Sequence, residues 1–235
     1  MNNMGDEFKN YATKHLGISG MDFYYWDKLQ ETLYSNVNVF GSMTPMILEE
    51  RELRVTQMSV FDRLMMDRII WLSGPVNDRM STIVVAQLMF MDNLEEKDIT
   101  FHVDSPGGSV KSGLSIVDQM NYISSDIITI NTGMAASMGS ILLGAGTKGK
   151  RYSLPNSRVM LHQVSAGMSG NIQDMKISFE ESEKYNKILF DLLGEYTNKD
   201  PKQVMEDTNR DLWLNSQEAL DYGIIDGIIS NKKKK

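Results

Sequence analysis

The feature that most constrains the fold is the repeated alternation of apolar strand patterns with helical patterns from about residue 59 onward. Strands alternating with helices favour one α/β domain. The helical pattern at 81–94 is apolar on most faces, which predicts a buried helix. The predicted strands are 69–72, 99–104, 127–131, 158–161 and 224–229, and the predicted helices are 59–68, 81–94, 110–123, 172–196, 201–209 and 216–222.

The composition limits the function classes. A chain of 235 residues can bury one sizeable core. Its 24 basic and 31 acidic residues give a net charge of −7, so nothing general favours nucleic-acid binding. The absence of cysteine excludes disulfides, thiolate metal sites and a cysteine nucleophile, and it fits a reducing compartment. The chain has no apolar run long enough to span a membrane and no secretory pattern at its start, so we expect a cytoplasmic protein.

Four segments differ in character. Residues 1–43 crowd aromatic side chains without a clean period, which we interpret as an N-terminal extension or pro-segment, with a docked element as the alternative. Residues 44–59 mix apolar residues with a run of charges, which predicts a mobile, solvated loop. Residues 60–230 carry the α/β pattern, and 231–235 form a lysine-rich tail that we expect to be frayed.

One strand-to-helix turn carries a candidate nucleophile. Ser137 lies among small residues between the strand pattern 127–131 and the short apolar stretch 141–143. A serine held there can expose its Oγ beside helix N-terminal amides, which can stabilise an oxyanion. The pattern Ala-x-Ser-x-Gly resembles a nucleophile elbow with alanine in the first glycine position. A serine that merely caps a packed helix is the alternative.

A serine nucleophile needs a base, and the chain has three histidines. His15 lies in the atypical N-terminal segment, and His102 lies inside a predicted strand, where most histidines are simply packed. His162 ends an apolar strand and precedes a glycine-rich loop, a position typical of catalytic groups. Asp211 precedes apolar residues at a helix end, where a partly buried carboxylate could orient an imidazole.

A glycine turn at residues 105–108 follows a predicted strand and precedes a helix. It leaves a peptide amide free to face a ligand, although a simple tight turn is the alternative.

Three motifs together resemble one family. DSPGGS at 104–109, GMAASMG at 133–139 and LPNSRVMLHQ at 154–163 are similar to motifs of the ClpP family, the proteolytic subunits of Clp proteases. The resemblance covers about residues 43–229 and keeps the order and spacing of the family.

The resemblance implies a serine endopeptidase that hydrolyses unfolded polypeptides and needs no metal or cofactor. Ser137 matches the nucleophile, His162 the general base and Asp211 the orienting acid. Gly108 and Met138 match the positions whose backbone amides form the oxyanion hole.

The resemblance also implies an assembly. The expected fold is a ClpP/crotonase-like spiral of ββα units with a protruding handle helix at 172–196, and fourteen subunits form two stacked seven-membered rings around a chamber. A ClpX-type or ClpA/ClpC-type ATPase unfoldase would feed unfolded protein through a pore lined by residues 44–59. Residues 167–171 would hold substrate as an added strand. His102 matches the docking pocket for the ATPase.

Arg210 matches an arginine that reaches across the ring interface to an acid in the opposite handle. Asp174 is the candidate partner by position, with Glu180 and Glu181 also near the handle. The alternative is an exposed helix-end cation.

The chain departs from the family pattern in one position and in one segment. Val164 stands where a proline is expected after His-Gln, which we expect to loosen the turn on the substrate side. The segment before Met43 matches no family motif, and self-trimming near residues 40–43 is implied only by the habit of the family.

Two other functional classes compete with this reading. One is a crotonase-like acyl-CoA enzyme, which lacks a Ser-His-Asp triad. The other is a non-catalytic subunit of a mixed ring.

Overall fold

The computed structural model describes residues 46–51, 54–167 and 169–230. The chain divides into two compact units at Val60. The predicted extension at 1–43 and the lysine-rich tail at 231–235 lie outside the described residues.

The first unit contains a β-hairpin. Strands β1 (Met46–Arg51) and β2 (Arg54–Ser59) pair antiparallel, from Met46 opposite Ser59 to Arg51 opposite Arg54. The prediction of a loop at 44–59 was therefore wrong in secondary structure. That prediction relied on the run of charged residues. Antiparallel pairing, however, forms backbone hydrogen bonds between the two strands whatever the charge of their side chains.

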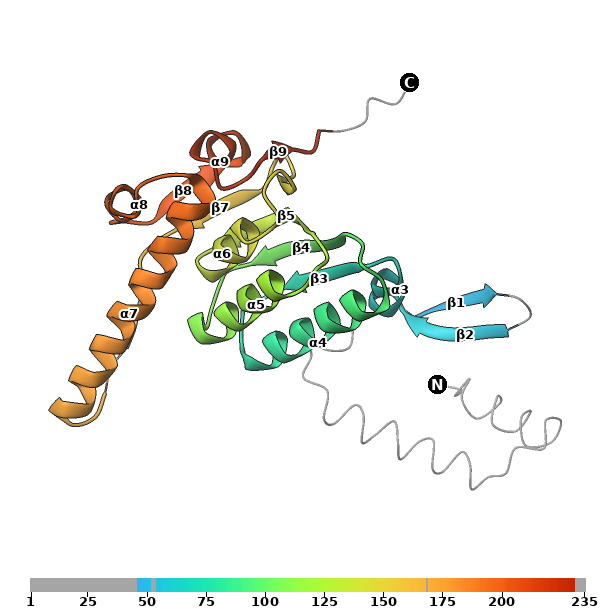
Figure 1. Cartoon of the computed structure of the whole chain (residues 1–235), viewed down its shortest axis with the longest axis horizontal. Helices are drawn as coiled ribbons and strands as arrows, with labels where there is room; N and C mark the ends of the chain where they lie inside the picture. Colours follow the sequence, from blue (N-terminus) through green and yellow to red (C-terminus); the bar gives the residue numbers. More distant parts are fainter. Residues whose placement is uncertain (1–45, 52–53, 168, 231–235) are drawn as a thin grey trace, which may run out of the picture. The chain divides into compact units, whose positions relative to one another are not determined.

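The second unit is built on a mixed seven-stranded sheet among the described residues (Figure 1). The strand order is β3-β4-β5-β6-β9, while β7 pairs with β5 and carries β8. All of these pairs are parallel except β7 with β8. The strands are β3 (Ile69–Ser73), β4 (Ile99–Ser105), β5 (Ile127–Ala136), β6 (Arg151–Ser153), β7 (Arg158–Leu161), β8 (Leu212–Asn215) and β9 (Gly227–Ile228).

Helices alternate with these strands, which confirms the predicted α/β class. Helices α4, α5 and α6 lie next to one another along the sheet, and α6 is buried over its whole length. The helices are α3 (Val60–Met66), α4 (Asp78–Leu94), α5 (Val110–Tyr122), α6 (Met138–Gly144), α7 (Ile172–Thr197), α8 (Pro201–Asp207) and α9 (Ser216–Tyr222).

Helix α4 differs from its prediction. It begins earlier than expected because the Asn77 side chain accepts a hydrogen bond from the N–H of Met80. The helix buries one stripe against the sheet and is not buried all round. Phe90 is 53% exposed and Leu94 is 66% exposed. The second apolar face therefore packs against nothing in the described part of the chain.

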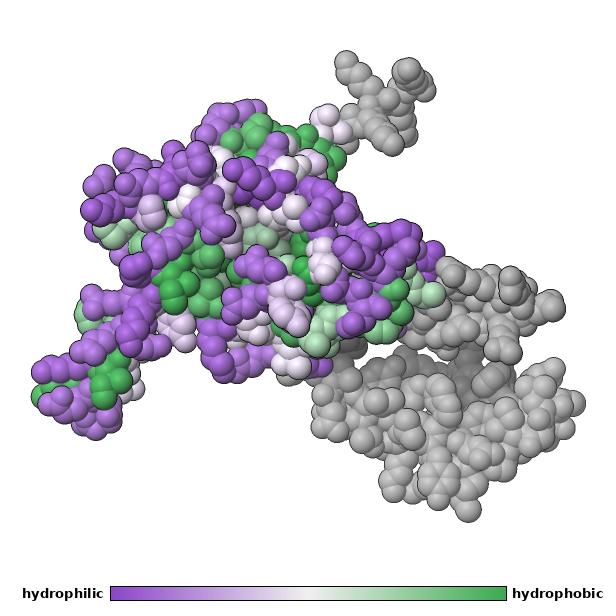
Figure 2. All heavy atoms as spheres, viewed as in Figure 1, coloured by the Kyte–Doolittle hydropathy of each residue, from purple (hydrophilic) through white to green (hydrophobic). Residues whose placement is uncertain are grey.

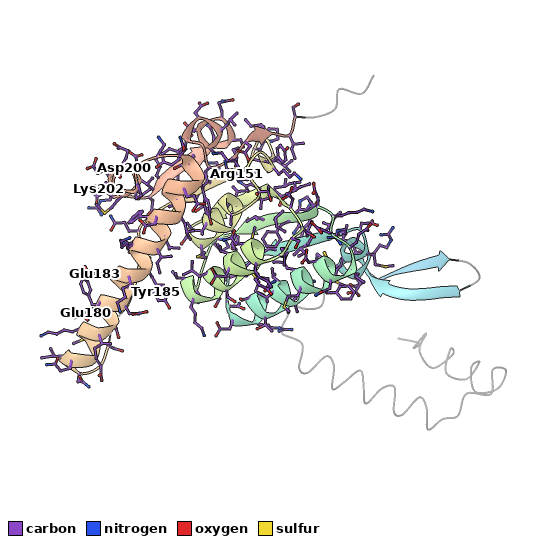
Figure 3. All side chains as sticks on the ribbon, in the orientation of Figure 1. Arg151, Glu180, Glu183, Tyr185, Asp200 and Lys202 are labelled. Carbon is purple, nitrogen blue, oxygen red and sulfur yellow. The ribbon has the colours of Figure 1, made fainter. Side chains whose placement is uncertain are left out.

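Helix α7 protrudes from the second unit, as the fold prediction required. Its buried residues, Phe190, Leu193, Gly194 and Thr197, all belong to its C-terminal part. The N-terminal part carries exposed apolar side chains, among them Phe179, and Figure 2 shows hydrophobic surface near this free end. In Figure 3, Glu180 and Glu183 lie along the protruding part.

An ion pair fixes the base of α7. The guanidinium of Arg151, in β6, donates to both carboxylate oxygens of Asp226, at 2.8 and 2.6 Å. It also donates to the carbonyl of Tyr196 in the last turn of α7, at 2.8 Å. Arg151 is 4% exposed, and Figure 3 shows it in the body of the unit. Burial alone would raise the pKa of Asp226, but the hydrogen bonds and charge of Arg151 outweigh burial and lower it.

We therefore predict that Arg151→Met destabilises the fold by about 3 kcal/mol, because the carboxylate of Asp226 loses its partner. Thermal unfolding followed by circular dichroism measures this loss. Because the pKa of Asp226 is lowered in the folded state, its contribution to stability is present at neutral pH and lost as the pH falls through that pKa. Asp226→Asn should accordingly reduce the acid sensitivity of unfolding. An Arg151→Met protein that melts like the wild type would contradict this assignment.

Candidate active site

The turn between β5 and α6 holds Ser137 in a rare backbone conformation, with φ 52° and ψ −123°. Non-glycine residues seldom adopt a positive φ, and such outliers cluster at functional sites. The N–H of Ser137 donates to the carbonyl of Met160 at 2.9 Å, and its carbonyl accepts from the N–H and the hydroxyl of Ser140. Its side chain makes no helix-capping hydrogen bond, so the alternative of a simple N-cap is wrong.

Small residues allow this turn to pack closely. A β-carbon at Gly139 would lie 2.8 Å from the carbonyl oxygen of Ser105, and one at Gly107 would lie 2.6 Å from the β-carbon of Ser137. Gly107 also has a φ of 92°, which favours glycine. The glycine turn after β4 is therefore in direct contact with Ser137.

Two backbone N–H groups beside Ser137 are free in the described part of the chain. Neither the N–H of Gly108 nor that of Met138 donates to another described residue. Both residues line the same pocket as Ser137, and Met138 is the first residue of α6. Free amides at a helix start can stabilise negative charge on a nearby oxygen.

His162 reaches Ser137 because of strand pairing. Strand β7 lies parallel to β5, with Met160 opposite Ala136, and His162 follows the last residue of β7. Its Nε2 lies 2.7 Å from the Oγ of Ser137. This distance is short enough for proton transfer between the two side chains.

Asp211 lies on the other side of the imidazole. Strands β7 and β8 pair antiparallel with Leu161 opposite Leu212, so His162 and Asp211 are the residues just outside the same pair. The Oδ1 of Asp211 lies 3.5 Å from the Nδ1 of His162. The side chain of Asp211 is 61% exposed, so the expectation of a partly buried carboxylate was wrong for the single chain. Asp211 immediately precedes β8, which pairs with β7 alone among the described strands.

The pocket beside Ser137 and His162 is small, at about 50 Å³, and is lined by polar and apolar groups in equal measure. Ile141 of α6 contributes to it, together with Leu189 and Leu193 of α7. Sequence reasoning missed the two leucines. Their spacing of four residues marks one helix face, but only the fold shows that this face lies against Ser137.

The other predicted residues lie elsewhere. His102 does not line this pocket; its ring stacks on Trp71 with 4.7 Å between centroids, and burial lowers its pKa. Arg210 makes no ion pair with a described residue, and the carboxylate of Asp174 accepts a hydrogen bond from Asn171 in the first turn of α7. No helix in the ranges that the structure describes is long and apolar enough to cross a membrane. No cluster of three or more potential ligands in those ranges could hold a metal ion.

Comparison with known proteins agrees with this geometry. A sequence model of the Clp protease family matches residues 51–232. An ATP-dependent Clp protease proteolytic subunit of Bacteroides thetaiotaomicron is 46% identical over 228 residues, which cover 97% of this chain and 100% of the relative. The protein of the same name from Porphyromonas gingivalis is 44% identical over 97% of this chain and its own full length. The one from Ligilactobacillus salivarius is 44% identical over 82% of this chain and 98% of its own.

These matches exclude the acyl-CoA alternative, because they cover most of the chain and name only peptidase subunits. The chain belongs to the Clp protease family of serine-type peptidases.

Proposed function

We propose that this chain hydrolyses peptide bonds of unfolded polypeptides with Ser137 as nucleophile, His162 as general base and Asp211 as the acid that orients His162. The observation that carries the proposal is the 2.7 Å contact between the Oγ of Ser137 and the Nε2 of His162, with a carboxylate on the other ring nitrogen. This contact also argues against a non-catalytic subunit.

The geometry supports acyl transfer in two stages. The Oγ of Ser137 attacks the scissile carbonyl while His162 accepts the hydroxyl proton. The N–H groups of Gly108 and Met138 donate to the oxyanion of the tetrahedral intermediate. His162 then gives its proton to the departing amine, and a water molecule, activated by the same imidazole, releases the acyl group from Ser137.

The segment after His162 supports binding of an extended substrate. Residues 162–167 have no regular secondary structure, and most of their backbone groups make no hydrogen bond to a described residue. We propose that residues 167–171 pair with the substrate as an added strand. An apolar side chain next to the scissile bond would then enter the pocket formed by Ile141, Leu189 and Leu193.

We predict that Ser137→Ala lowers the turnover of a short fluorogenic peptide by roughly 10⁴-fold or more, as loss of a triad nucleophile does. A fluorophosphonate probe should label wild-type protein at Ser137 alone and leave the variant unlabelled. Undiminished peptide cleavage by Ser137→Ala would refute the mechanism.

The two described histidines provide a matched comparison. His162→Ala should abolish labelling of Ser137, because the hydroxyl loses its base. His102→Ala should label normally, since its ring stacks on Trp71 and does not line the pocket. If His102 docks the ATPase, that variant should instead be slow in ATPase-dependent degradation of a folded protein. The reverse pattern would show that the base was assigned to the wrong histidine.

We further propose that the chain assembles into two stacked seven-membered rings in the cytoplasm and receives substrate from a ClpX-type or ClpA/ClpC-type ATPase. The names of the relatives, which call them ATP-dependent proteolytic subunits, support the ATPase. The exposed apolar face of α4 supports contact with another chain.

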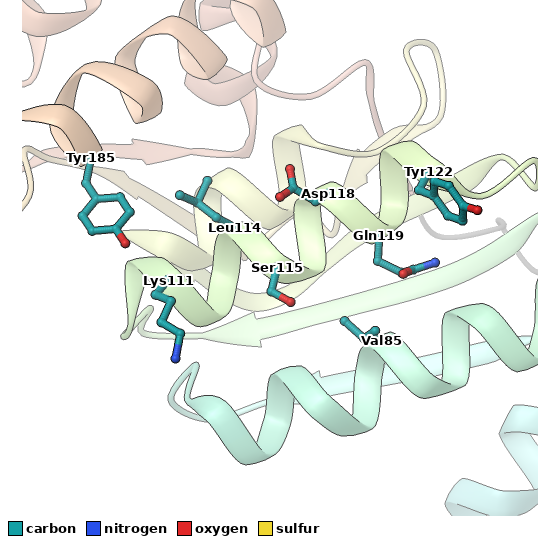
Figure 4. Close-up of a pocket in the computed structure, with 8 residues that line it drawn as sticks. All are labelled: Val85, Lys111, Leu114, Ser115, Asp118, Gln119, Tyr122 and Tyr185. Atoms are coloured by element: carbon teal, nitrogen blue, oxygen red, sulfur yellow. The ribbon is translucent and has the colours of Figure 1, made fainter.

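A separate groove of about 570 Å³ is lined by residues of α4, α5 and α7 (Figure 4). Val85 of α4, Leu114 and Tyr122 of α5 and Tyr185 of α7 contribute to its lining. Tyr122 is 84% exposed, and the Nε2 of Gln119 is buried without a partner among described residues. An apolar groove with an unused donor fits a surface that a neighbouring subunit covers.

Arg210 connects assembly to the site, because it precedes Asp211 and makes no ion pair with a described residue, so it can reach an acid of the opposite ring, such as Asp174. We predict that Arg210→Ala shifts the double ring towards single rings on size exclusion and lowers peptidase activity in parallel. Lys202→Ala, on the exposed surface of α8, is a matched control. An Arg210→Ala protein that remains a fully active double ring would leave Arg210 as a surface charge.

A further inference from the structure

The segment that follows His162 has little to hold it in place. Strand β7 ends at Leu161, so the sheet gives no ladder hydrogen bonds beyond that residue. Among the hydrogen bonds between described residues, the backbone of 163–167 contributes one. The N–H of Val164 donates to the Oδ1 of Asn186, in α7, at 3.0 Å.

This hydrogen bond depends on a departure from the family pattern. The motif resemblance expects proline at position 164, and proline has no N–H to donate. The structure thus points away from the expectation that valine loosens this turn. Valine lacks the rigid ring of proline, but its N–H forms a hydrogen bond to Asn186 of α7 instead.

Asn186 lies where α7 meets the rest of the second unit. Asn186, Leu189 and Leu193 are spaced i, i+3 and i+7 and share one helix face, and both leucines line the pocket with Ser137 and His162. Leu193 is 2% exposed and Phe190 is 6% exposed, so this part of the helix is anchored in the core. Asn186 is therefore a fixed acceptor, in contrast to the exposed residues nearer the start of α7.

We propose that Asn186 is a positioning residue for His162. By accepting the N–H of Val164, it holds the segment two residues beyond His162 and keeps the imidazole within reach of the Oγ of Ser137. This inference rests on the proposed triad. Loss of the hydrogen bond between Val164 and Asn186 should therefore slow the chemical step, because His162 and Ser137 would be less well aligned.

The test compares variants that differ in the acceptor. Asn186→Leu keeps the approximate size and removes the oxygen, and it should slow both fluorophosphonate labelling of Ser137 and kcat by about 10-fold with little change in KM. Asn186→Asp keeps an oxygen acceptor and should recover most of the rate. Lys187→Leu alters the next residue of α7, whose ammonium pairs with Asp191 on the surface, and should label like the wild type.

The donor provides a second, independent arm. In a Val164→Pro background the hydrogen bond is already absent, so Asn186→Leu should cause no further loss whatever the rate of that background. Melting temperature and size exclusion, measured for every variant, separate misplacement of His162 from unfolding or ring dissociation.

Three results would overturn the inference: wild-type labelling by Asn186→Leu, equal losses in the valine and proline backgrounds, or failure of Asn186→Asp to recover the rate. Failure of the triad is a different outcome. It would appear as full peptide turnover by Ser137→Ala. If instead the wild type is labelled at Ser137 and Asn186→Leu is labelled equally fast, only the role of Asn186 is refuted.

Discussion

The site depends on one tightly packed turn, at which the backbone of Ser137 is held at a positive φ. Such a conformation costs about 1–3 kcal/mol and persists only where its surroundings fix it. Here the fixing groups come from three places: the carbonyl of Met160 in β7, the glycine turn after β4, and the buried helix α6. The glycine turn and α6 supply the free N–H groups of Gly108 and Met138, and β7 leads directly to His162. The contacts that hold Ser137 therefore also place the proposed base and the proposed oxyanion donors around it.

Strand register extends this arrangement to residues far apart in the chain. The parallel pairing of β7 with β5 places His162 beside Ser137, and the antiparallel pairing of β8 with β7 places Asp211 beside His162. A shift of one residue in either pair would turn alternate side chains to the opposite face of the sheet and separate the three groups. Helix α7 then closes the pocket with Leu189 and Leu193, so the helix that protrudes from the unit also forms part of the site.

The sequence predicted the parts of this structure that are encoded locally. The α/β class, the protruding helix and the strand-to-helix turn at Ser137 follow from apolar spacing and small residues, and the motifs pointed to His162 and Asp211. The failures were of another kind. The β1–β2 hairpin depends on pairing between strands, the exposed face of α4 cannot be told from a buried one by composition, and the exposure of Asp211 depends on what covers β8. Likewise, Asn186 and Leu189 became visible as site residues only once the position of α7 was known.

The ion pair at the base of α7 has a consequence for how the chain is made. Arg151 and Asp226 are 75 positions apart, so a growing chain contains the whole of α7 well before the carboxylate that completes its anchor has been synthesised. A nascent polypeptide folds from its N-terminal side onward. Until the carboxylate of Asp226 emerges from the ribosome, the guanidinium of Arg151 therefore lacks its counter-charge. The ion pair at the base of α7 is thus completed only when translation is nearly finished. A nascent chain that ends before Asp226 would carry Ser137 and His162 without the completed ion pair at the base of α7.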